Sequence, residues 1–335
     1  MQENRQQTEQ SQPCEQGSCS KGFKTMCGGQ ALIEGIMMRG PKKQAVVVRR
    51  PDGELEVQEK ELKLIKDKHP VLGWPLIRGV VNFGDSMYNG VKALMFSAEF
   101  FPDDEEPEEP SKFDLWLERR FGSEKAASFV TTLAVVLGVG MSIGLFFLLP
   151  TLLGTAVTLV AGDSMLARNL AENLLKIVIF VGYLALCSRL KEMKRVFSYH
   201  GAEHKTIFCY EAGLPLTVPN VRVQPRHHPR CGTSFLFMVI AISIIVSTVV
   251  FSIWPISNPI LRFLAHLAML PLIVGISYEF NRWAGRHDGP ITRILTAPGL
   301  WLQNFTTFEP DDSMIEVGIK ALELVLPEKQ GEDAW

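Results

Sequence analysis

Residues 199–205 read YHGAEHK, which places two histidines and a glutamate at the spacing of a metal site. His200 and His204 are four residues apart, so on a helix their imidazoles project from one face and can share a zinc ion at about 2.0 to 2.1 Å. Glu203 would act on a metal-bound water, and the order H-x-x-E-H is the inverted form of the zinc metallopeptidase signature. The pattern predicts a zinc site with a catalytic base; two aligned surface histidines are the competing interpretation.

A second polar segment, residues 227–234, reads HHPRCGTS and offers a further ligand. Cys231 would complete three protein ligands and leave the fourth position for water. The same cysteine also fits a nucleophile activated by a nearby histidine, or a small buried residue before a helix. The third ligand therefore stays open among Cys231, His227, His228, Glu211 and Glu279.

Both segments need elements that bring them together. The helix carrying the first motif is expected to continue an apolar stretch, residues 170–190, without a breaker before Gly213, which would hold the motif about 15 Å beyond a membrane. We expect Thr233 or Ser234 to cap the next helix. Residues 303–310 are polar in an apolar context and could fold back onto the site.

Composition places these elements in lipid. Of 335 residues 47% are hydrophobic and 21% charged, and the mean hydropathy is +0.12, so the fold class is a mainly α, polytopic helical membrane protein. Lys176 is expected to snorkel to the interface. Residues 151–162 fit either a kinked continuation of the first span or a re-entrant segment. Four stretches are long enough to cross a hydrocarbon core of about 30 Å: 126–149, 170–190, 234–254 and 259–280.

Lysines and arginines in the short loops set the orientation. They concentrate before the first span, between the second and third, and after the fourth, which predicts a plasma-membrane protein with both termini and the loop 191–233 in the cytoplasm. A net charge of −2 excludes an overall excess of positive charge, so no nucleic-acid partner is expected. Six cysteines are too few for a disulfide framework and are expected to be reduced thiols.

The remaining segments predict a peripheral part. Residues 44–57 have β-branched runs around an Asp-Gly turn, typical of a β-hairpin, and residues 76–101 indicate an amphipathic helix on the membrane or docked to the bundle. Ser313 and Glu316 form a capping-box pattern before a final helix. Five divisions are expected: a disordered polar tail (1–27), an N-terminal α/β peripheral domain (28–102), an acidic linker (103–125), a membrane domain (126–280) and a C-terminal interfacial region (281–335).

Five blocks together carry a family resemblance: GGQALIEGIMMRGP, IRGVVNFGDSMYNGVKAL, YHGAEHK, HHPRCGTSF and LQNFTTFEPDD. They resemble the YqhQ-like family of bacterial membrane proteins, whose members are labelled predicted metal-dependent enzymes with no assigned reaction. The resemblance covers roughly residues 25 to 327. It implies a multi-span membrane protein with a metal site at His200, Glu203, His204 and Cys231, and it supplies no substrate.

Two functions remain. The first is a metal-dependent hydrolase, such as a peptidase, in which zinc lowers the pKa of its water and Glu203 takes the proton. The second is a non-enzymatic assembly, regulatory or scaffold protein in which the same polar cluster pins loops together or contacts a partner. In both, the lipid bilayer and other membrane proteins are the expected partners, and an open or closed zinc coordination sphere separates the two functions.

Overall fold

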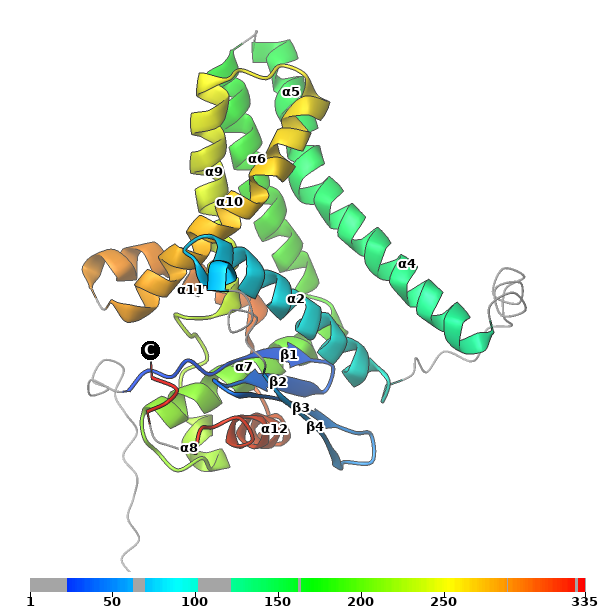
Figure 1. Cartoon of the computed structure of the whole chain (residues 1–335), viewed down its shortest axis with the longest axis vertical. Helices are drawn as coiled ribbons and strands as arrows, with labels where there is room; N and C mark the ends of the chain where they lie inside the picture. The colour runs from blue at the N-terminus through cyan, green and yellow to red at the C-terminus, as the bar shows by residue number, and fades with distance from the viewer. Residues whose placement is uncertain are drawn as a thin grey trace, which may run out of the picture.

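The structure is a computed structural model that describes residues 23–62, 70–101, 122–161, 164–287, 289–328 and 331–334. An elongated bundle of apolar helices stands above a smaller part built around a β-sheet (Figure 1). Most of the expected polar tail, residues 1–22, and most of the acidic linker, residues 102–121, lie outside the described residues.

The sheet is a four-stranded antiparallel meander in the order β1-β2-β3-β4. The predicted hairpin is confirmed as β3 and β4, which pair from Lys43 opposite Glu61 to Arg49 opposite Leu55. The hairpin before it was not predicted, because glycines open both of its strands and weaken the strand pattern. The strands are β1 Gly28–Leu32, β2 Gly35–Arg39, β3 Lys43–Arg49 and β4 Leu55–Glu61.

Both faces of the sheet are covered by helices, because β2 and β3 carry apolar residues on both sides. On one face, Ile36 and Val47 pack against α7 (Lys191–Glu211) and α12 (Asp312–Glu323). On the other face, Met37 and Val46 pack against the end of α2 (Ile77–Ala98). This core joins three distant segments of the chain, so the expected continuous domain 28–102 holds only part of it, and the division into domains stays a prediction.

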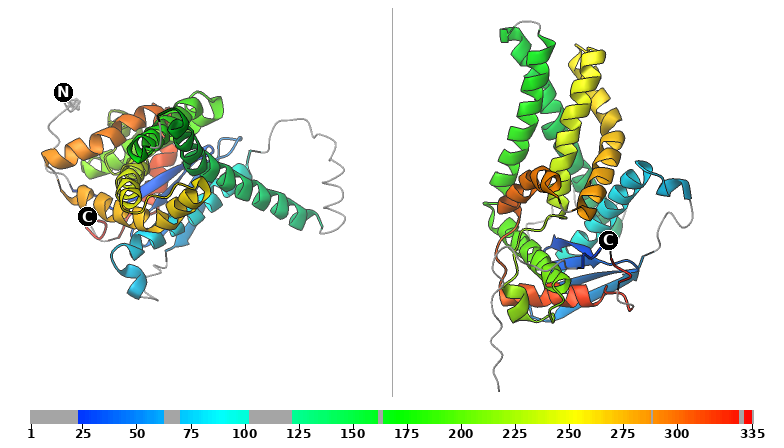
Figure 2. Two further views of the ribbon diagram at one scale, coloured as in Figure 1. Left: turned by 90° about the horizontal axis from the view of Figure 1, so that it is seen from above. Right: turned by 90° about the vertical axis from the view of Figure 1, so that its left-hand side faces the viewer.

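Four helices of the bundle are long and apolar enough to cross a membrane: Phe129–Val157, Met165–Cys187, Gly232–Ile253 and Pro259–Arg286. The first comprises most of α4 (Ser123–Ile143), the π-helical turn η2 (Gly144–Leu148) and most of α5 (Leu149–Ala161). The other three are α6 (Met165–Cys187), α9 (Gly232–Ile253) and α10 (Pro259–Arg286). Residues 151–161 are therefore a helical continuation of the first span. Figure 2 shows α4 projecting away from the other helices.

The amphipathic segments flank the bundle. The predicted helix over 76–101 is α2, and it docks to α10 through an ion pair between Arg78 and Glu279. After α10 comes α11 (Pro290–Thr306), which leaves Ile294 and Trp301 exposed. The short helix α8 (Val218–Arg222) and the 3-10 turn η1 (Pro70–Gly73) complete the described elements.

The expected rigid continuation from the second span into the histidine motif is wrong. Helix α6 ends at Cys187 and α7 begins at Lys191, with Leu190 extended between them at φ −68° and ψ 137°. No proline or glycine marks the break in residues 188–190. The chain turns there because α7 buries Tyr199, Ala202 and Ile207 in the core beneath the sheet.

Three smaller expectations are also corrected. Helix α9 is capped by Cys231, whose sulfur accepts from the Thr233 N–H, and neither Thr233 nor Ser234 is the cap. Helix α12 is capped by Asp311 in place of Ser313. Lys176 does not snorkel, because its side chain is buried beside Glu172 within the bundle.

Candidate functional site

His200, His204 and Cys231 converge where the bundle meets the sheet. Two ring nitrogens and the sulfur lie within 4.8 Å of one another. His200 Nε2 is 3.1 Å from Cys231 Sγ, and the centroids of the two imidazole rings are 4.4 Å apart. Two ligands of one tetrahedral zinc ion lie roughly 3.3 to 3.7 Å apart, so the donor atoms already stand close to the separation that zinc requires.

Backbone carbonyls fix the orientation of both imidazoles. His200 Nδ1 lies 2.8 Å from the carbonyl oxygen of Thr306, and His204 Nδ1 lies 2.5 Å from that of Arg226. Since a carbonyl oxygen only accepts, each Nδ1 carries the proton and donates it. In the neutral rings the Nε2 lone pairs are left for a ligand, which is the arrangement of metal-bound histidines.

Cys231 and His200 form an electrostatically matched pair. Burial by itself disfavours the Cys231 thiolate, but His200 and His204 outweigh it and hold the pKa of this thiol well below its ordinary value. Burial likewise disfavours charge on His200, and the opposing charge and hydrogen bond of Cys231 raise its pKa to about 9. The thiolate is the form of cysteine that binds metals and acts as a nucleophile.

Glu203 extends from α7 toward β1, where its Oε1 accepts from the Gly29 N–H at 2.8 Å. Its other oxygen, Oε2, is buried and has no hydrogen-bond partner among the described residues. Burial raises the pKa of this carboxyl despite the two histidines nearby. A Cβ at Gly29 would lie 3.0 Å from the Glu203 carboxyl carbon and 2.7 Å from the Met37 carbonyl oxygen, so the close approach requires glycine.

Gly201 weakens a helix by about 1 kcal/mol relative to alanine, and the site explains its presence. A Cβ at this position would lie 2.0 Å from the Phe308 carbonyl oxygen. The Phe308 N–H in turn donates to the Phe197 carbonyl at 2.9 Å. The glycine lets residues 306–310 run against α7, and that segment supplies the Thr306 carbonyl which orients His200.

The other candidate ligands are engaged elsewhere. Glu211 pairs with Arg230, and its Oε2 lies 3.8 Å from His228 Nε2. Glu279 pairs with Arg78. His227 lies outside the three-residue cluster. Among the candidates for the third ligand, the structure therefore brings Cys231 to the two histidines.

The sequence indicated the segment 303–310 but not the contacts that its residues make, nor the carbonyl of Arg226. Gln303 clamps the second motif, because its Oε1 accepts from the His228 N–H at 2.7 Å and its Nε2 donates to the His228 carbonyl at 2.8 Å. The expectation that residues 303–310 fold back onto the site is met by this clamp and by Thr306. The carbonyls of Thr306 and Arg226 gave no signal, since every residue has one.

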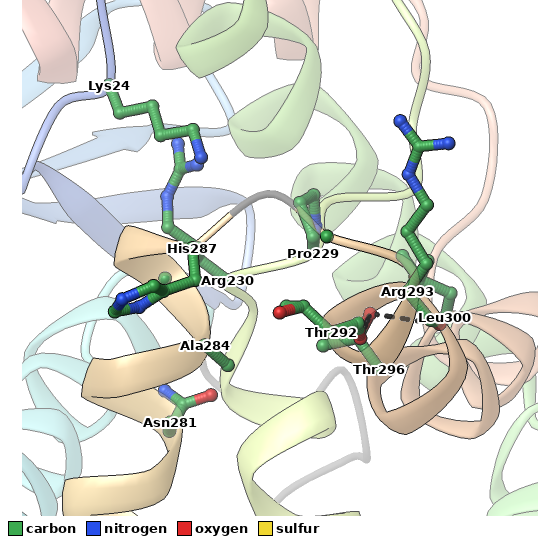
Figure 3. Close-up of a pocket in the computed structure, with 12 residues that line it drawn as sticks. Lys24, Pro229, Arg230, Asn281, Ala284, His287, Thr292, Arg293, Thr296 and Leu300 are labelled. Atoms are coloured by element: carbon green, nitrogen blue, oxygen red, sulfur yellow. Dashed lines mark hydrogen bonds between the residues drawn. The ribbon is translucent and has the colours of Figure 1, made fainter.

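A cavity of about 240 Å³ lies beside the site, between α10, α11 and the loop before α9 (Figure 3). Pro229 and Arg230 line it, so it shares a wall with the loop that presents Cys231. None of the four site residues lines it. The remaining lining residues are Lys24, Asn281, Ala284, Gly285, His287, Gly289, Thr292, Arg293, Thr296 and Leu300.

Comparisons with known proteins give a family and no activity. The chain is similar to the uncharacterised protein YqhQ of Bacillus subtilis (strain 168), with 36% identity over 306 residues that cover 89% of this chain and 92% of that protein. No solved structure matches this chain. A family model described as a protein of unknown function, DUF1385, matches residues 74–328, and with the relative at this identity it shows that the chain belongs to this YqhQ-like family.

Proposed function

We propose that the chain is an integral protein of the bacterial plasma membrane, with both termini and residues 191–233 in the cytoplasm. The four long apolar helices support insertion. The excess of lysine and arginine at the sheet side of the bundle supports the orientation. The exposed Ile294 and Trp301 of α11 suit a helix that lies at the interface.

The proposed function is zinc-dependent hydrolysis at His200, His204 and Cys231. The observation that carries it is the convergence of three ligand atoms within 4.8 Å, with both Nδ1 atoms bonded to carbonyls. Two imidazoles and a thiolate suit zinc, and three protein ligands leave a position for water.

Glu203 is the proposed catalytic base. A zinc ion held by His200, His204 and Cys231 would lower the pKa of a bound water toward 7. The Oε2 atom of Glu203, unpartnered among the described residues, would accept a proton from that water while Oε1 stays bonded to Gly29. The hydrogen bonds from each Nδ1 to the carbonyls of Thr306 and Arg226 keep the Nε2 atoms of His200 and His204 in position to bind the metal.

A structural role for the same zinc is the second candidate, and burial favours it. His204 is 1% exposed and Cys231 is 7% exposed, and the neighbouring cavity is not lined by either. A zinc ion there would tie α7, the loop before α9 and the end of α11 into one unit.

Metal analysis of purified variants tests the site. The wild-type protein should contain about one zinc equivalent, and the double variant His200→Ala, His204→Ala should contain none while still inserting in the membrane. His227→Ala is the matched control, because this histidine lies next to the cluster and outside it. Undiminished zinc in the double variant would remove the site.

Glu203→Gln separates the two candidate functions. The amide is nearly isosteric, so zinc and folding should survive, while loss of the base should lower the rate by about two to four orders of magnitude. Complementation of a strain lacking the gene gives the readout without a known substrate. Glu192→Gln, at an exposed position on the same helix, is the control. Full complementation by Glu203→Gln with normal zinc would exclude Glu203 as a catalytic base and favour the structural role.

Orientation is tested with single cysteines in a cysteine-free background. Cysteine at Lys194 or Arg222 should resist an impermeant thiol reagent in intact cells and react after lysis, whereas cysteine at Ser257 should react in both. The reverse pattern would place the histidine motif outside the cell.

A further inference from the structure

A second cluster of ionisable side chains is buried between α6 and α10. Its residues come from the first half of each helix, and these halves lie in the part of the bundle remote from the sheet (Figure 1). Glu172 and Lys176 come from α6, and Arg262 and His266 come from α10. Their exposed fractions are 1%, 6%, 1% and 1%, respectively. Ionisable groups buried in spanning helices are rare because they are costly, and they mark ion or proton pathways more often than packing.

Glu172 is the centre of the cluster. Its Oε2 accepts from Arg262 Nε at 2.7 Å, and its Oε1 accepts from Thr151 Oγ1 at 2.8 Å. His266 Nε2 lies 2.5 Å from the same Oε1. Lys176 Nζ lies 3.4 Å from that oxygen and 3.3 Å from His266 Nε2. Lys176 and His266 therefore compete for one oxygen atom of a single carboxylate.

The charges do not balance when every group is ionised. Arginine stays protonated in proteins, so Arg262 already neutralises Glu172. A charged Lys176 would leave one positive charge in surplus, and a charged Lys176 together with a charged His266 would leave two. Arg168, which is 3% exposed on α6, adds a further cation near this end of the bundle. The described contacts from α5 and α9 are uncharged: Thr151 and Phe251.

One ring nitrogen is positioned to bind a proton. His266 Nδ1 is buried and has no hydrogen-bond partner among the described residues, while Nε2 of the same ring contacts Glu172. In the neutral tautomer that donates Nε2–H to Glu172, the Nδ1 lone pair is unused. A proton can therefore be added at Nδ1 without breaking the contact with the carboxylate.

We propose that His266 and Lys176, held against Glu172, form a proton-binding site inside the helix bundle. Hydronium from solvent transfers its proton to the Nδ1 of neutral His266 or to the lone pair of a neutral Lys176. The new N–H bond forms as the O–H bond of hydronium breaks, and water is released. Repulsion between the two cations limits uptake to one proton at a time. The inference rests on the proposed insertion of α6 and α10, and it is independent of zinc.

The competing role is a permanent ion network that fixes the register of α6 against α10 without changing its charge. The two roles differ in one observable, the protonation state of His266 as the pH changes. A permanent network keeps the ring in one state. A proton-binding site changes it reversibly, and its midpoint depends on Lys176.

Nitrogen NMR of the full chain in lipid bilayers, with histidine labelled, makes the measurement. His266 is assigned by the signal that His266→Gln removes. We expect this signal to convert reversibly between neutral ring and imidazolium between about pH 5 and pH 8. In Lys176→Met the midpoint should rise by about one pH unit or more, a tenfold gain in proton affinity, because the competing cation is gone. His287→Gln, which changes an exposed histidine, should leave the midpoint unchanged.

One charge state of His266 across this range, in both the wild type and Lys176→Met, overturns the proposal. Resistance of the protein to alkaline extraction, checked on the same membranes, establishes that the helices are inserted. Zinc content of the same samples separates the two proposals. Normal zinc with a static His266 refutes only the proton site, and a titrating His266 without zinc refutes only the metal site.

Discussion

The two polar clusters of this molecule are built on opposite principles. The bundle cluster contains its own counter-charges, since Glu172 accepts from Arg262 and lies against Lys176 and His266. The cluster at the sheet contains two imidazoles and a thiol within 4.8 Å, with each Nδ1 already bonded to a carbonyl. The bundle cluster meets most of its charges and hydrogen bonds internally. The cluster at the sheet directs its ligand atoms at one another.

The contrast distinguishes ionic packing from ligand binding. At the sheet, Cys231 and His200 pair with each other, and their ligand atoms also stand at the separation that a bound cation requires. A carboxylate surrounded by donors needs no added ion. What can still change is the number of protons that the carboxylate and its donors bind together. The bundle cluster should therefore depend on pH and on its own partners, and the sheet cluster on a metal.

Removal of the Glu172 carboxylate should have the largest effect. Glu172→Met leaves Lys176 and Arg262 buried without an anion, and we expect it to cost about 3 to 5 kcal/mol of unfolding free energy. Denaturant unfolding in detergent measures this. The double variant Glu172→Met, Arg262→Met should recover part of the loss, and Leu170→Met, at an exposed position of the same helix, should be neutral. Equal stability of the single variant and the wild type would contradict the network.

Metal removal should have the next largest effect, and only at the sheet cluster. A ligand present at 100 to 1,000 times its dissociation constant stabilises the folded state by about 2.7 to 4.1 kcal/mol. Chelation should therefore lower the melting temperature of the wild type and leave that of His200→Ala, His204→Ala unchanged. A bundle variant such as Lys176→Met should respond to the chelator as the wild type does. A chelator effect that survives in the double histidine variant would place the metal elsewhere.

Gly201→Ala should destabilise the sheet cluster through packing alone. The added Cβ would lie 2.0 Å from the Phe308 carbonyl oxygen, and such overpacking costs about 1 to 3 kcal/mol. Gly84→Ala is the matched control, because it lies in α2 with nothing within 4 Å of the added atom. It should stabilise its helix by up to about 1 kcal/mol. Thermal unfolding of both variants checks the difference, and a neutral Gly201→Ala would refute the close approach.

The smallest effect should be a pH dependence at the edge of the sheet cluster. Burial opposes ionisation of Glu211, but His228 and Arg230 outweigh it and lower its pKa. This carboxylate therefore contributes stability that is present above its ordinary pKa of about 4.3 and is lost as the pH falls through the lower folded value. Arg230→Met should be less stable than the wild type at pH 7, and the difference should shrink toward acidic pH. A difference independent of pH would assign the effect to packing.

The helices were predictable wherever the apolar pattern is long. The four candidate spans lie where the apolar runs indicate, because about 20 apolar residues in succession have few other stable structures. The hairpin over 44–57 was equally clear, since an Asp-Gly turn between β-branched runs is a local signal. These elements depend on residues that are neighbours in the chain, so no distant contact is needed to recognise them.

The break between α6 and α7 was not predictable, because no residue from 188 to 190 requires it. The free energy that favours the break comes from burying Tyr199 and Ala202 against Ile36, more than 160 residues earlier in the chain. The buried position of Lys176 has the same origin, since its Nζ lies 3.3 Å from His266 Nε2 on another helix, 90 residues later in the chain. In each case a distant contact overrides a local preference.

The sequence alone was enough to predict His200 and His204 as candidate ligands, because the H-x-x-E-H spacing places both on one face of any helix. Only the tertiary structure selected Cys231 among the possible third ligands and supplied the carbonyls of Thr306 and Arg226. It also gathered Glu172 and His266, 94 residues apart, into one cluster. The physical reason is that residue types and helical spacing are local properties, whereas convergence depends on packing between segments that no local pattern encodes.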